Sequence, residues 1–346
     1  GVTGQGGSGM YYVQSVTTPE AGRTRVVLKA NPNWWGLRAG RHPHLTEIDW
    51  TYFSAVDAAY SQYAAGLYAV GYPTPTTLAS ARTQRDFHQA LTLDSLGVFM
   101  GWDQPPLDNP DARIALCLAI DRDALNQSAF GGARMPTWHL VPQGMPGYNG
   151  DLTGPDGVTN IHGDAARAQA HWQAYLRTLG GAPPASMGLP YLLGSAVQDA
   201  EAHALQQQWQ TVLGVYVILV GYSSSPPRTT PNLGQPLALA DWSLDYPDPQ
   251  DILSGLLDPT SPYNVEHINY PAAATLVQQA DMSADAAQRL AMYNQAEQLY
   301  INQAAWCPLA QSAVRYQVRS WVRGWTLDAA GIPANDAWIA TYLVAH

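Results

Sequence analysis

The pattern of apolar and polar positions predicts a chain that alternates strands with helices. Short apolar or alternating runs, typical of strands, are expected at 10–13, 25–28, 46–53, 96–102, 187–193, 215–220, 237–242 and 307–315. Apolar positions at helical spacing predict helices at 57–67, 109–131, 164–179, 196–213, 271–281 and 284–304. This alternation is typical of an α/β protein.

The segment 187–220 predicts a parallel pair of strands. A helix at 196–213 separates the strands 187–193 and 215–220, and Gly214 ends that helix. A strand–helix–strand order allows the two strands to run side by side in the same direction. The Ser-, Pro- and Thr-rich stretch at 223–236 is expected to be irregular, because its prolines disfavour a regular helix.

A helix is also expected to begin at Asn109. The Asn109 side chain suits an N-cap, and Pro110 fits the first turn of a helix. Helical spacing then continues to the paired glycines at 131–132, which end the helix. Arg122 and Asp123 lie within this span and are expected to be structural, as a cap or as a salt bridge between turns.

The last segment of the chain is expected to rejoin the first, which gives two lobes. In this interpretation residues 1–95 and 314–346 form the first lobe, and 96–313 form a second α/β lobe. A chain of 346 residues is long enough for two such lobes.

Composition excludes several classes of protein. Hydrophobic residues make up 46% of the chain and charged residues 13%, which indicates a packed globular protein. The net charge is −10, Lys29 is the only lysine and no basic cluster occurs in the sequence, so nucleic-acid binding is not expected. No apolar run approaches the roughly 18 residues of a membrane span.

The two cysteines leave two interpretations open. Cys117 lies in an apolar helical pattern, and Cys307 lies at the start of an apolar strand. Their spacing fits no metal-binding motif. Two small buried core residues are the favoured interpretation, and a disulfide is the alternative.

Motifs of catalysis and cofactor binding are weak. The glycine pattern at 4–9 matches a dinucleotide-binding fingerprint in its letters, but no strand precedes it and a strand follows it. His42 and His44 are expected to lie in a surface turn rather than to bind a metal. No catalytic residue, cofactor or metal is therefore expected. A carboxylate-pair hydrolase stays the main enzyme alternative, because such pairs need no sequence signature.

Several short motifs follow one another in a shared order along most of the chain. They lie at 7–11, 31–36, 105–113, 119–123, 141–148, 213–215, 242–249 and 289–300. In this order they resemble the extracellular solute-binding proteins of family 5, the peptide- and nickel-binding receptors of ABC importers. The resemblance implies a periplasmic-binding-protein-like type II fold of class C with two lobes. It also implies that an N-terminal part, with a targeting signal and a small extra domain, is missing.

The resemblance implies a receptor and not an enzyme. Such a receptor binds a peptide-like solute outside the cytoplasm and delivers it to a membrane permease. It is expected to be monomeric and to be a periplasmic protein or a cell-surface lipoprotein. An oligosaccharide or nickel-chelate receptor is one alternative, and a sensory or regulatory domain with the same fold is another.

The resemblance also implies where a ligand binds. In peptide-binding members an aspartate three residues after a tryptophan pairs with the α-amino group of the ligand, and this pattern falls on Trp242 and Asp245. The other expected ligand contacts are Tyr246 in the same loop, Ser195, Gln198, Tyr222 and Trp102. Asp248 and Asp251 are expected to form a solvated turn. A calcium loop is the sharper alternative, but the spacing lacks the glycine and the final glutamate of an EF-hand.

Overall fold

The structure, a computed structural model, describes residues 7–223, 234–328, 331, 333 and 337–345. The chain forms two compact units, one of residues 1–90 with 314–346 and one of residues 91–313. Most of the irregular stretch predicted at 223–236 and the first half of the glycine pattern at 4–9 lie outside the described residues.

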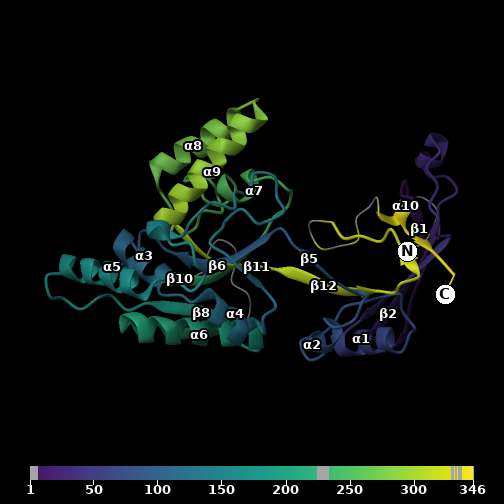
Figure 1. Cartoon of the computed structure of the whole chain (residues 1–346), viewed down its shortest axis with the longest axis horizontal. Coiled ribbons are helices and arrows are strands. Elements are labelled where there is room, and N and C mark those ends of the chain that lie inside the picture. The colour runs from purple at the N-terminus through teal and green to yellow at the C-terminus, as the bar shows by residue number, and fades with distance from the viewer. Residues whose placement is uncertain (1–6, 224–233, 329–330, 332, 334–336, 346) are drawn as a thin grey trace. The chain divides into compact units, whose positions relative to one another are not determined.

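A three-stranded antiparallel sheet forms the N-terminal part of the first unit (Figure 1). β1 (Tyr11–Glu20) and β2 (Arg23–Ala30) contain the strands predicted at 10–13 and 25–28 and make a hairpin, and β3 (Glu47–Phe53) pairs with the other edge of β2. Gly22 in the hairpin turn has a φ of 77°, and a Cβ atom there would lie 2.4 Å from the Ser54 hydroxyl. The turn therefore requires a glycine.

The remaining elements of the first unit are short and come from both of its chain segments. The helical ones are η1 (Trp35–Ala39), α1 (Val56–Ala64), α2 (Leu78–Ala81) and α10 (Ala337–Ala340). The strands are β4 (Val70–Gly71), β5 (Phe87–Leu91), β12 (Ala313–Val318), β13 (Val322–Arg323) and β14 (Tyr342–Leu343). β12 lies between β4 and β5 in one sheet, and β13 pairs with β14. Segments far apart in the sequence thus build one unit.

A four-stranded antiparallel sheet lies at the centre of the second unit. Its strands follow the order β10 (Leu237–Ser243), β6 (Asp94–Met100), β11 (Trp306–Gln311) and β7 (Met135–Pro136). Successive side chains of a strand point to opposite faces. Accordingly Val98 and Cys307 belong to one hydrophobic core, whereas Phe99 and Trp306 belong to another.

Helices cover both faces of this sheet (Figure 1). One face carries α3 (Pro110–Leu118), α4 (Arg122–Phe130), α5 (Ala165–Thr178) and α6 (Ala196–Leu213). The other carries α7 (Gln250–Leu253), α8 (Pro271–Met282) and α9 (Ala286–Asn302). A short η2 (Pro155–Gly157) precedes α5. The helices predicted near 164–179, 196–213, 271–281 and 284–304 are confirmed.

The predicted parallel pair of strands is also confirmed. β8 (Gly188–Leu192) and β9 (Ile218–Tyr222) run parallel, and α6 connects them. β9 begins three residues later than predicted. The reason is that the Val215 N–H still donates to the Trp209 carbonyl at the end of α6, so the chain leaves the helix only after this point.

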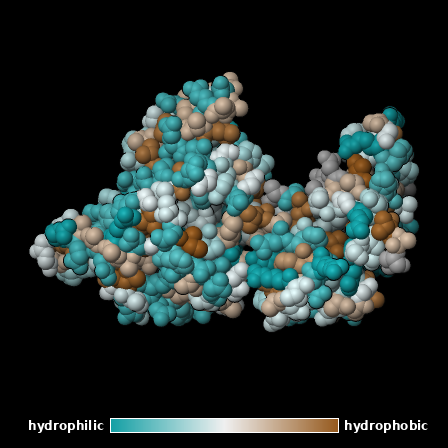
Figure 2. Space-filling model, viewed as in Figure 1, coloured by the Kyte–Doolittle hydropathy of each residue, from teal (hydrophilic) through white to brown (hydrophobic). Residues whose placement is uncertain are grey.

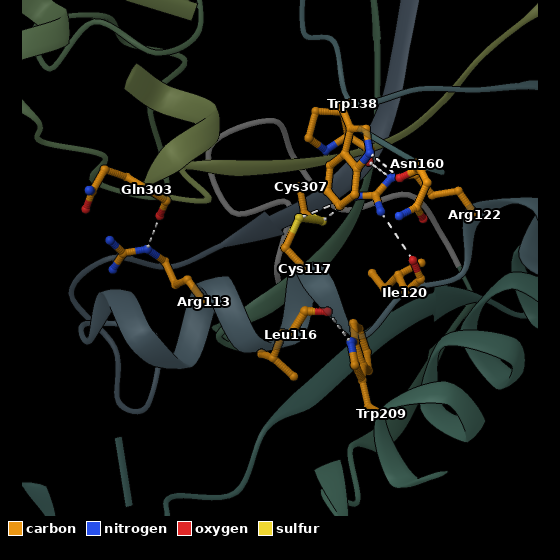
Figure 3. The surroundings of a disulfide bond; sticks show 11 residues. Arg113, Leu116, Cys117, Ile120, Arg122, Trp138, Asn160, Trp209, Gln303 and Cys307 are labelled. Atoms are coloured by element: carbon orange, nitrogen blue, oxygen red, sulfur yellow. Dashed lines mark hydrogen bonds between the residues drawn. A yellow bond between two sulfur atoms is a disulfide. The ribbon is translucent and has the colours of Figure 1, made fainter. Parts of the chain in front are cut away.

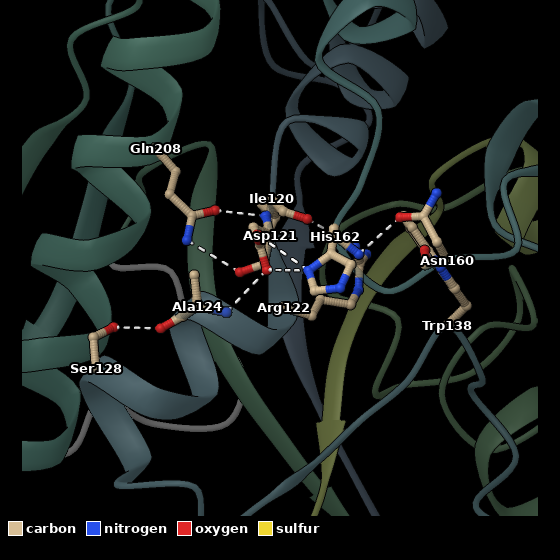
Figure 4. A network of polar contacts seen from close by, with 9 residues as sticks. All are labelled: Ile120, Asp121, Arg122, Ala124, Ser128, Trp138, Asn160, His162 and Gln208. Atoms are coloured by element: carbon tan, nitrogen blue, oxygen red, sulfur yellow. Dashed lines mark hydrogen bonds and ion pairs between the residues drawn. The ribbon is translucent and has the colours of Figure 1, made fainter.

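The single helix predicted at 109–131 is wrong, because two helices replace it. α3 ends at Leu118, and Asp121 then caps α4 by accepting a hydrogen bond from the Ala124 N–H at 2.9 Å (Figure 4). The Gln208 side chain contacts both the N–H and the carbonyl of Asp121, at 2.7 and 3.1 Å. An aspartate with these partners favours a new helix start over a continuous helix.

Cys117 and Cys307 form a disulfide that joins α3 to β11 (Figure 3). The interpretation as two separate core thiols is therefore wrong. The two Cα atoms are 5.6 Å apart, although 190 positions separate the residues in the sequence. Both side chains point into the core between the sheet and the helices. Their pairing follows from this packing and not from their spacing in the sequence.

Arg122 is buried beside this disulfide (Figure 3). Its Nη2 lies 3.4 and 3.3 Å from the two sulfur atoms, its Nε donates to the Pro308 carbonyl at 2.7 Å, and its guanidinium lies over the Trp138 ring. Burial lowers the pKa of Arg122 well below its usual value. The predicted salt bridge between turns is thus wrong, and the cap of α4 is Asp121 rather than Asp123.

Apolar side chains of the second unit gather mainly in its two cores. Figure 2 shows mostly hydrophilic residues on the visible face of this unit, with small hydrophobic patches between them. Every helix in the described ranges is too short or too polar to cross a membrane.

Candidate functional site

The loop after β10 is held in place by one buried carboxylate. Asp251, in the first turn of α7, is only 4% exposed. Its Oδ1 accepts a hydrogen bond from the Trp242 indole at 2.7 Å, and its Oδ2 accepts one from the Asp245 backbone N–H at 2.8 Å. The structure therefore brings Trp242 and Asp245 together, and the expectation of a solvated turn is wrong for Asp251.

Asp248 in the same loop binds an arginine of α9. Arg289 donates to its two carboxylate oxygens, at 2.7 Å each, and the Gln250 N–H donates at 2.9 Å. Burial raises the pKa of Asp248, but the hydrogen bonds from Arg289 and Gln250 outweigh it and leave the pKa below its usual value. Asp248 and Asp251 thus both bind protein donors, which argues against the calcium alternative.

Asp245 and Tyr246 are polar groups that this loop presents to solvent. The Asp245 carboxylate is exposed and forms no ion pair within the described part of the chain. Tyr246 is exposed, and its hydroxyl donates to the Gln250 side chain at 3.2 Å. The half-buried Trp242 ring meets Tyr263 edge to face, with ring centroids 5.7 Å apart. An exposed carboxylate beside aromatic rings can bind an ammonium group.

Ser195 and Gln198 lie at the start of α6, shortly after the carboxyl end of β8, and Tyr222 is the last residue of β9. Ser195 caps α6 by accepting from the Gln198 N–H at 3.3 Å, and the Gln198 side chain accepts from the Leu192 N–H at 2.8 Å. The Tyr222 carbonyl accepts from the Leu193 N–H at 2.8 Å. Ligands of open α/β sheets bind at such strand ends. Ligand contact by these three residues stays a prediction.

Trp102 follows β6 and is covered by a buried arginine. The guanidinium of Arg113 lies 3.8 Å from the centre of the Trp102 ring, and burial lowers the pKa of Arg113 to about 10. The indole N–H of Trp102 is buried and has no hydrogen-bond partner among the described residues. Ligand contact at this ring also stays a prediction.

Glu266, whose backbone pairs with that of Trp102, has a buried carboxyl group that the sequence interpretation missed. Its backbone carbonyl accepts from the Trp102 N–H at 2.9 Å. The side chain is 1% exposed, and neither oxygen has a hydrogen-bond partner in the described ranges. Burial raises the pKa of Glu266 to about 7. It lies in a loop without apolar periodicity, so no sequence signal marked it.

Glu201 on α6 is a second carboxyl group that sequence reasoning missed. It is 2% exposed, and burial raises its pKa to about 8 against the opposing charge of Arg134. Arg134 also lies 3.6 Å from the Asp94 carboxylate. The position of Glu201 on α6 could have revealed it. Glu201 precedes Ala202 and lies four residues before Leu205, so helical spacing places it on the buried face of α6.

Replacing Asp251 with asparagine is expected to destabilise the loop after β10. An amide oxygen can accept one of the two hydrogen bonds, while its NH₂ group faces the other donor. The free energy of unfolding is therefore expected to fall by about 1–3 kcal/mol. Chemical denaturation followed by tryptophan fluorescence measures this change. Asp199→Asn, at an exposed position on α6, is the matched control. Equal losses in the two variants would contradict the role of Asp251.

Comparison with known sequences identifies relatives of this chain. Residues 4–264 match the family described as bacterial extracellular solute-binding proteins, family 5 Middle. The periplasmic murein peptide-binding protein MppA of Escherichia coli is 24% identical, over 98% of this chain and 62% of MppA. The dipeptide-binding protein of Escherichia coli is 24% identical, over 89% of this chain and 57% of that protein. The chain thus spans less than two thirds of the length of these relatives.

Solved structures share the fold of this chain. The unliganded open form of MppA has a TM-score of 0.77 at 22% identity, and the match covers 98% of this chain and 64% of that one. HbpA2 from Haemophilus parasuis has a TM-score of 0.80 at 19% identity, over 97% and 64% of the two chains. These similarities confirm the predicted periplasmic-binding-protein-like type II α/β fold.

Proposed function

Because the chain belongs to the bacterial extracellular solute-binding proteins of family 5, we propose that it binds a peptide-like solute for an ABC importer. The family consists of solute-binding receptors rather than enzymes. The relatives named above bind murein peptide and dipeptides, which supports a peptide-like ligand. The proposed partner is a membrane permease, and the proposed location is outside the cytoplasm, in the periplasm or at the cell surface as a lipoprotein. The receptor is proposed to act as a monomer.

The exposed Asp245 carboxylate is the observation that carries this proposal. A charged ligand terminus loses its hydration on binding, so an opposite charge must meet it. The Asp245 backbone and the Trp242 ring are both fixed by Asp251, which prepares the site before a ligand arrives. We infer that Asp245 pairs with the α-amino group of the ligand and that Trp242 and Tyr246 flank it.

Peptides with a free amine are expected to bind more tightly than their N-acetylated counterparts. Isothermal titration calorimetry with a defined set of di- to pentapeptides measures both affinities. Asp245→Asn is expected to weaken binding of the free-amine peptides by about 10- to 100-fold, because one charge-assisted contact is lost. Acetylated peptides are expected to bind wild type and variant alike, and Asp199→Asn is again the matched control.

Two outcomes contradict parts of this account. Equal weakening of free and acetylated peptides by Asp245→Asn removes Asp245 from the amine site. Tight binding of an oligosaccharide or a nickel chelate, with no binding of any peptide in the set, overturns the peptide assignment while the family assignment stands.

A further inference from the structure

The first unit contains a second kind of candidate site, a groove that we call the basic groove. Among the residues that line it, the basic and aromatic ones are Arg85, His88, Tyr316, Arg319, Arg323 and Trp325. Its volume is about 920 Å³, which is within the range of small-molecule binding sites. The lining comes from the segment around β5 and from the segment that contains β12 and β13, and both segments belong to the first unit.

The basic groove concentrates positive charge on an acidic chain. The whole sequence has 17 basic residues against 27 acidic ones. Nevertheless three arginines line this groove, with Asp86 as the single carboxylate among its described lining residues. Arg85 and Arg323 are exposed and have no carboxylate partner in the described parts of the chain. An excess of positive charge therefore faces the groove.

Asp86 forms no ion pair with Arg85 or Arg323 in the described parts of the chain, because its two oxygens accept hydrogen bonds from other groups. The Tyr63 hydroxyl donates to Oδ2, and the Gln317 side chain donates to Oδ1 at 2.8 Å. Burial raises the pKa of Asp86, but these hydrogen bonds and the positive charge of Arg319 outweigh it and lower the pKa overall. The carboxylate thus belongs to a hydrogen-bonded network in the groove wall, and this single negative charge still leaves an excess from the three arginines.

Arg319 is held rigidly at the wall of the groove. Its Nη2 donates to the Tyr63 carbonyl, and its guanidinium lies 4.1 Å from the centre of the Tyr63 ring. A guanidinium fixed in this way loses little conformational entropy when an anion binds beside it. The groove therefore combines one ordered arginine with two exposed ones.

Aromatic rings form the apolar wall of the groove. His88 stacks on Tyr316 with ring centroids 5.2 Å apart, and Tyr316 meets Trp325 edge to face at 5.0 Å. Rings that pack against one another present a flat, rigid surface to a ligand. An organic anion can place its charged group at the arginines and its carbon skeleton against these rings.

We propose that the basic groove binds a small organic molecule that carries a multivalent oxyanion, such as a phosphate or several carboxylates. Guanidinium groups donate parallel hydrogen bonds to such oxyanions, and the excess of positive charge favours a ligand with more than one negative charge. This ligand differs in sign from the ammonium group proposed for the Asp245 loop. The two sites lie in different units and can be tested separately.

Isothermal titration calorimetry of the whole chain at constant ionic strength tests the proposal. Inorganic pyrophosphate and citrate are the probes, in separate arms, so that phosphate and carboxylate chemistry can be distinguished. At least one probe is expected to bind with 1:1 stoichiometry. The double variant R85Q/R323Q is expected to weaken this binding by about 100-fold, roughly tenfold for each charged contact.

Arg38→Gln is the matched control, because Arg38 is an exposed arginine of the same unit outside the groove. It is expected to leave anion binding unchanged. Thermal melting checks that the variants fold. If the double variant does not fold, the single variants R85Q and R323Q replace it, and each is expected to weaken anion binding roughly tenfold. The proposal is overturned if neither probe binds the wild type, or if R38Q weakens binding as much as the groove variants do.

Discussion

Replacing Cys117 and Cys307 with serine is expected to lower the free energy of unfolding of the second unit by about 5 kcal/mol. The disulfide closes a loop of 190 residues, and the chain-entropy estimate for a loop of this length is about 5 kcal/mol. The serine hydroxyl can still accept a hydrogen bond from Arg122, so the variant tests mainly the loss of the covalent link. Guanidinium denaturation followed by circular dichroism measures the change.

The same measurement on wild-type protein with a reducing agent is the control for this variant. Both sulfur atoms are buried, so reduction is expected to follow unfolding rather than to precede it. Reduced wild type and the double serine variant should then unfold at the same denaturant concentration. Equal free energies of unfolding for oxidised wild type and the variant would contradict a stabilising role of the disulfide between α3 and β11.

Removing the Glu297 side chain is the second change with a large expected effect. Glu297 on α9 is fully buried, and its Oε1 accepts hydrogen bonds from the N–H groups of Leu140 and Val141 at 2.8 and 2.9 Å. Glu297→Ala leaves both donors without an acceptor and opens a cavity. The free energy of unfolding is therefore expected to fall by about 3–5 kcal/mol in chemical denaturation.

Glu297→Gln separates the hydrogen bonds from the charge. Burial raises the pKa of Glu297 from 4.5 to about 8, although the two N–H groups oppose this shift. As pH rises from 4.5 to about 8, the unfolded chain loses a proton that the folded chain keeps, so stability falls by about 1.4 kcal/mol per pH unit. Glutamine resembles the protonated acid in shape and does not titrate, so the stability of the variant is not expected to fall with pH on account of residue 297.

Wild type and Glu297→Gln are thus expected to be similarly stable near pH 4.5, and the variant is expected to be more stable by a few kcal/mol near pH 8. Denaturation curves at several pH values measure the difference. Glu201 keeps a similar pH dependence in both proteins, because burial raises its pKa in the same way. Parallel pH profiles for wild type and variant would contradict a buried protonated Glu297.

Local patterns in the sequence predicted much of the second unit. The parallel pair of β8 and β9 followed from the strand–helix–strand order, and the N-cap at Asn109 followed from its side chain. The break between α3 and α4 was missed because the apolar periodicity continues across Asp121, which has its capping partner three residues away. The disulfide was missed because it depends on how α3 packs on β11.

The candidate site was predicted only in part for a similar reason. The family resemblance pointed to Trp242 and Asp245, and their contact with a ligand stays a prediction. In the structure Asp251 accepts hydrogen bonds from the Trp242 indole and from the Asp245 backbone N–H. That Asp251 is buried depends on how the loop folds back on α7, which spacing alone does not reveal. Glu201 and Glu266 carry no motif, and only their surroundings in the fold distinguish them from surface carboxylates.

Hydrogen–deuterium exchange with and without peptide tests the central claim most directly, because it locates the ligand on the chain. A saturating tripeptide with a free amine is expected to slow exchange of the backbone amides between Trp242 and Asp251. Its N-acetylated counterpart, at the same concentration, is expected to protect them much less. Protection that appears elsewhere while 242–251 exchanges unchanged would contradict a ligand site at Asp245.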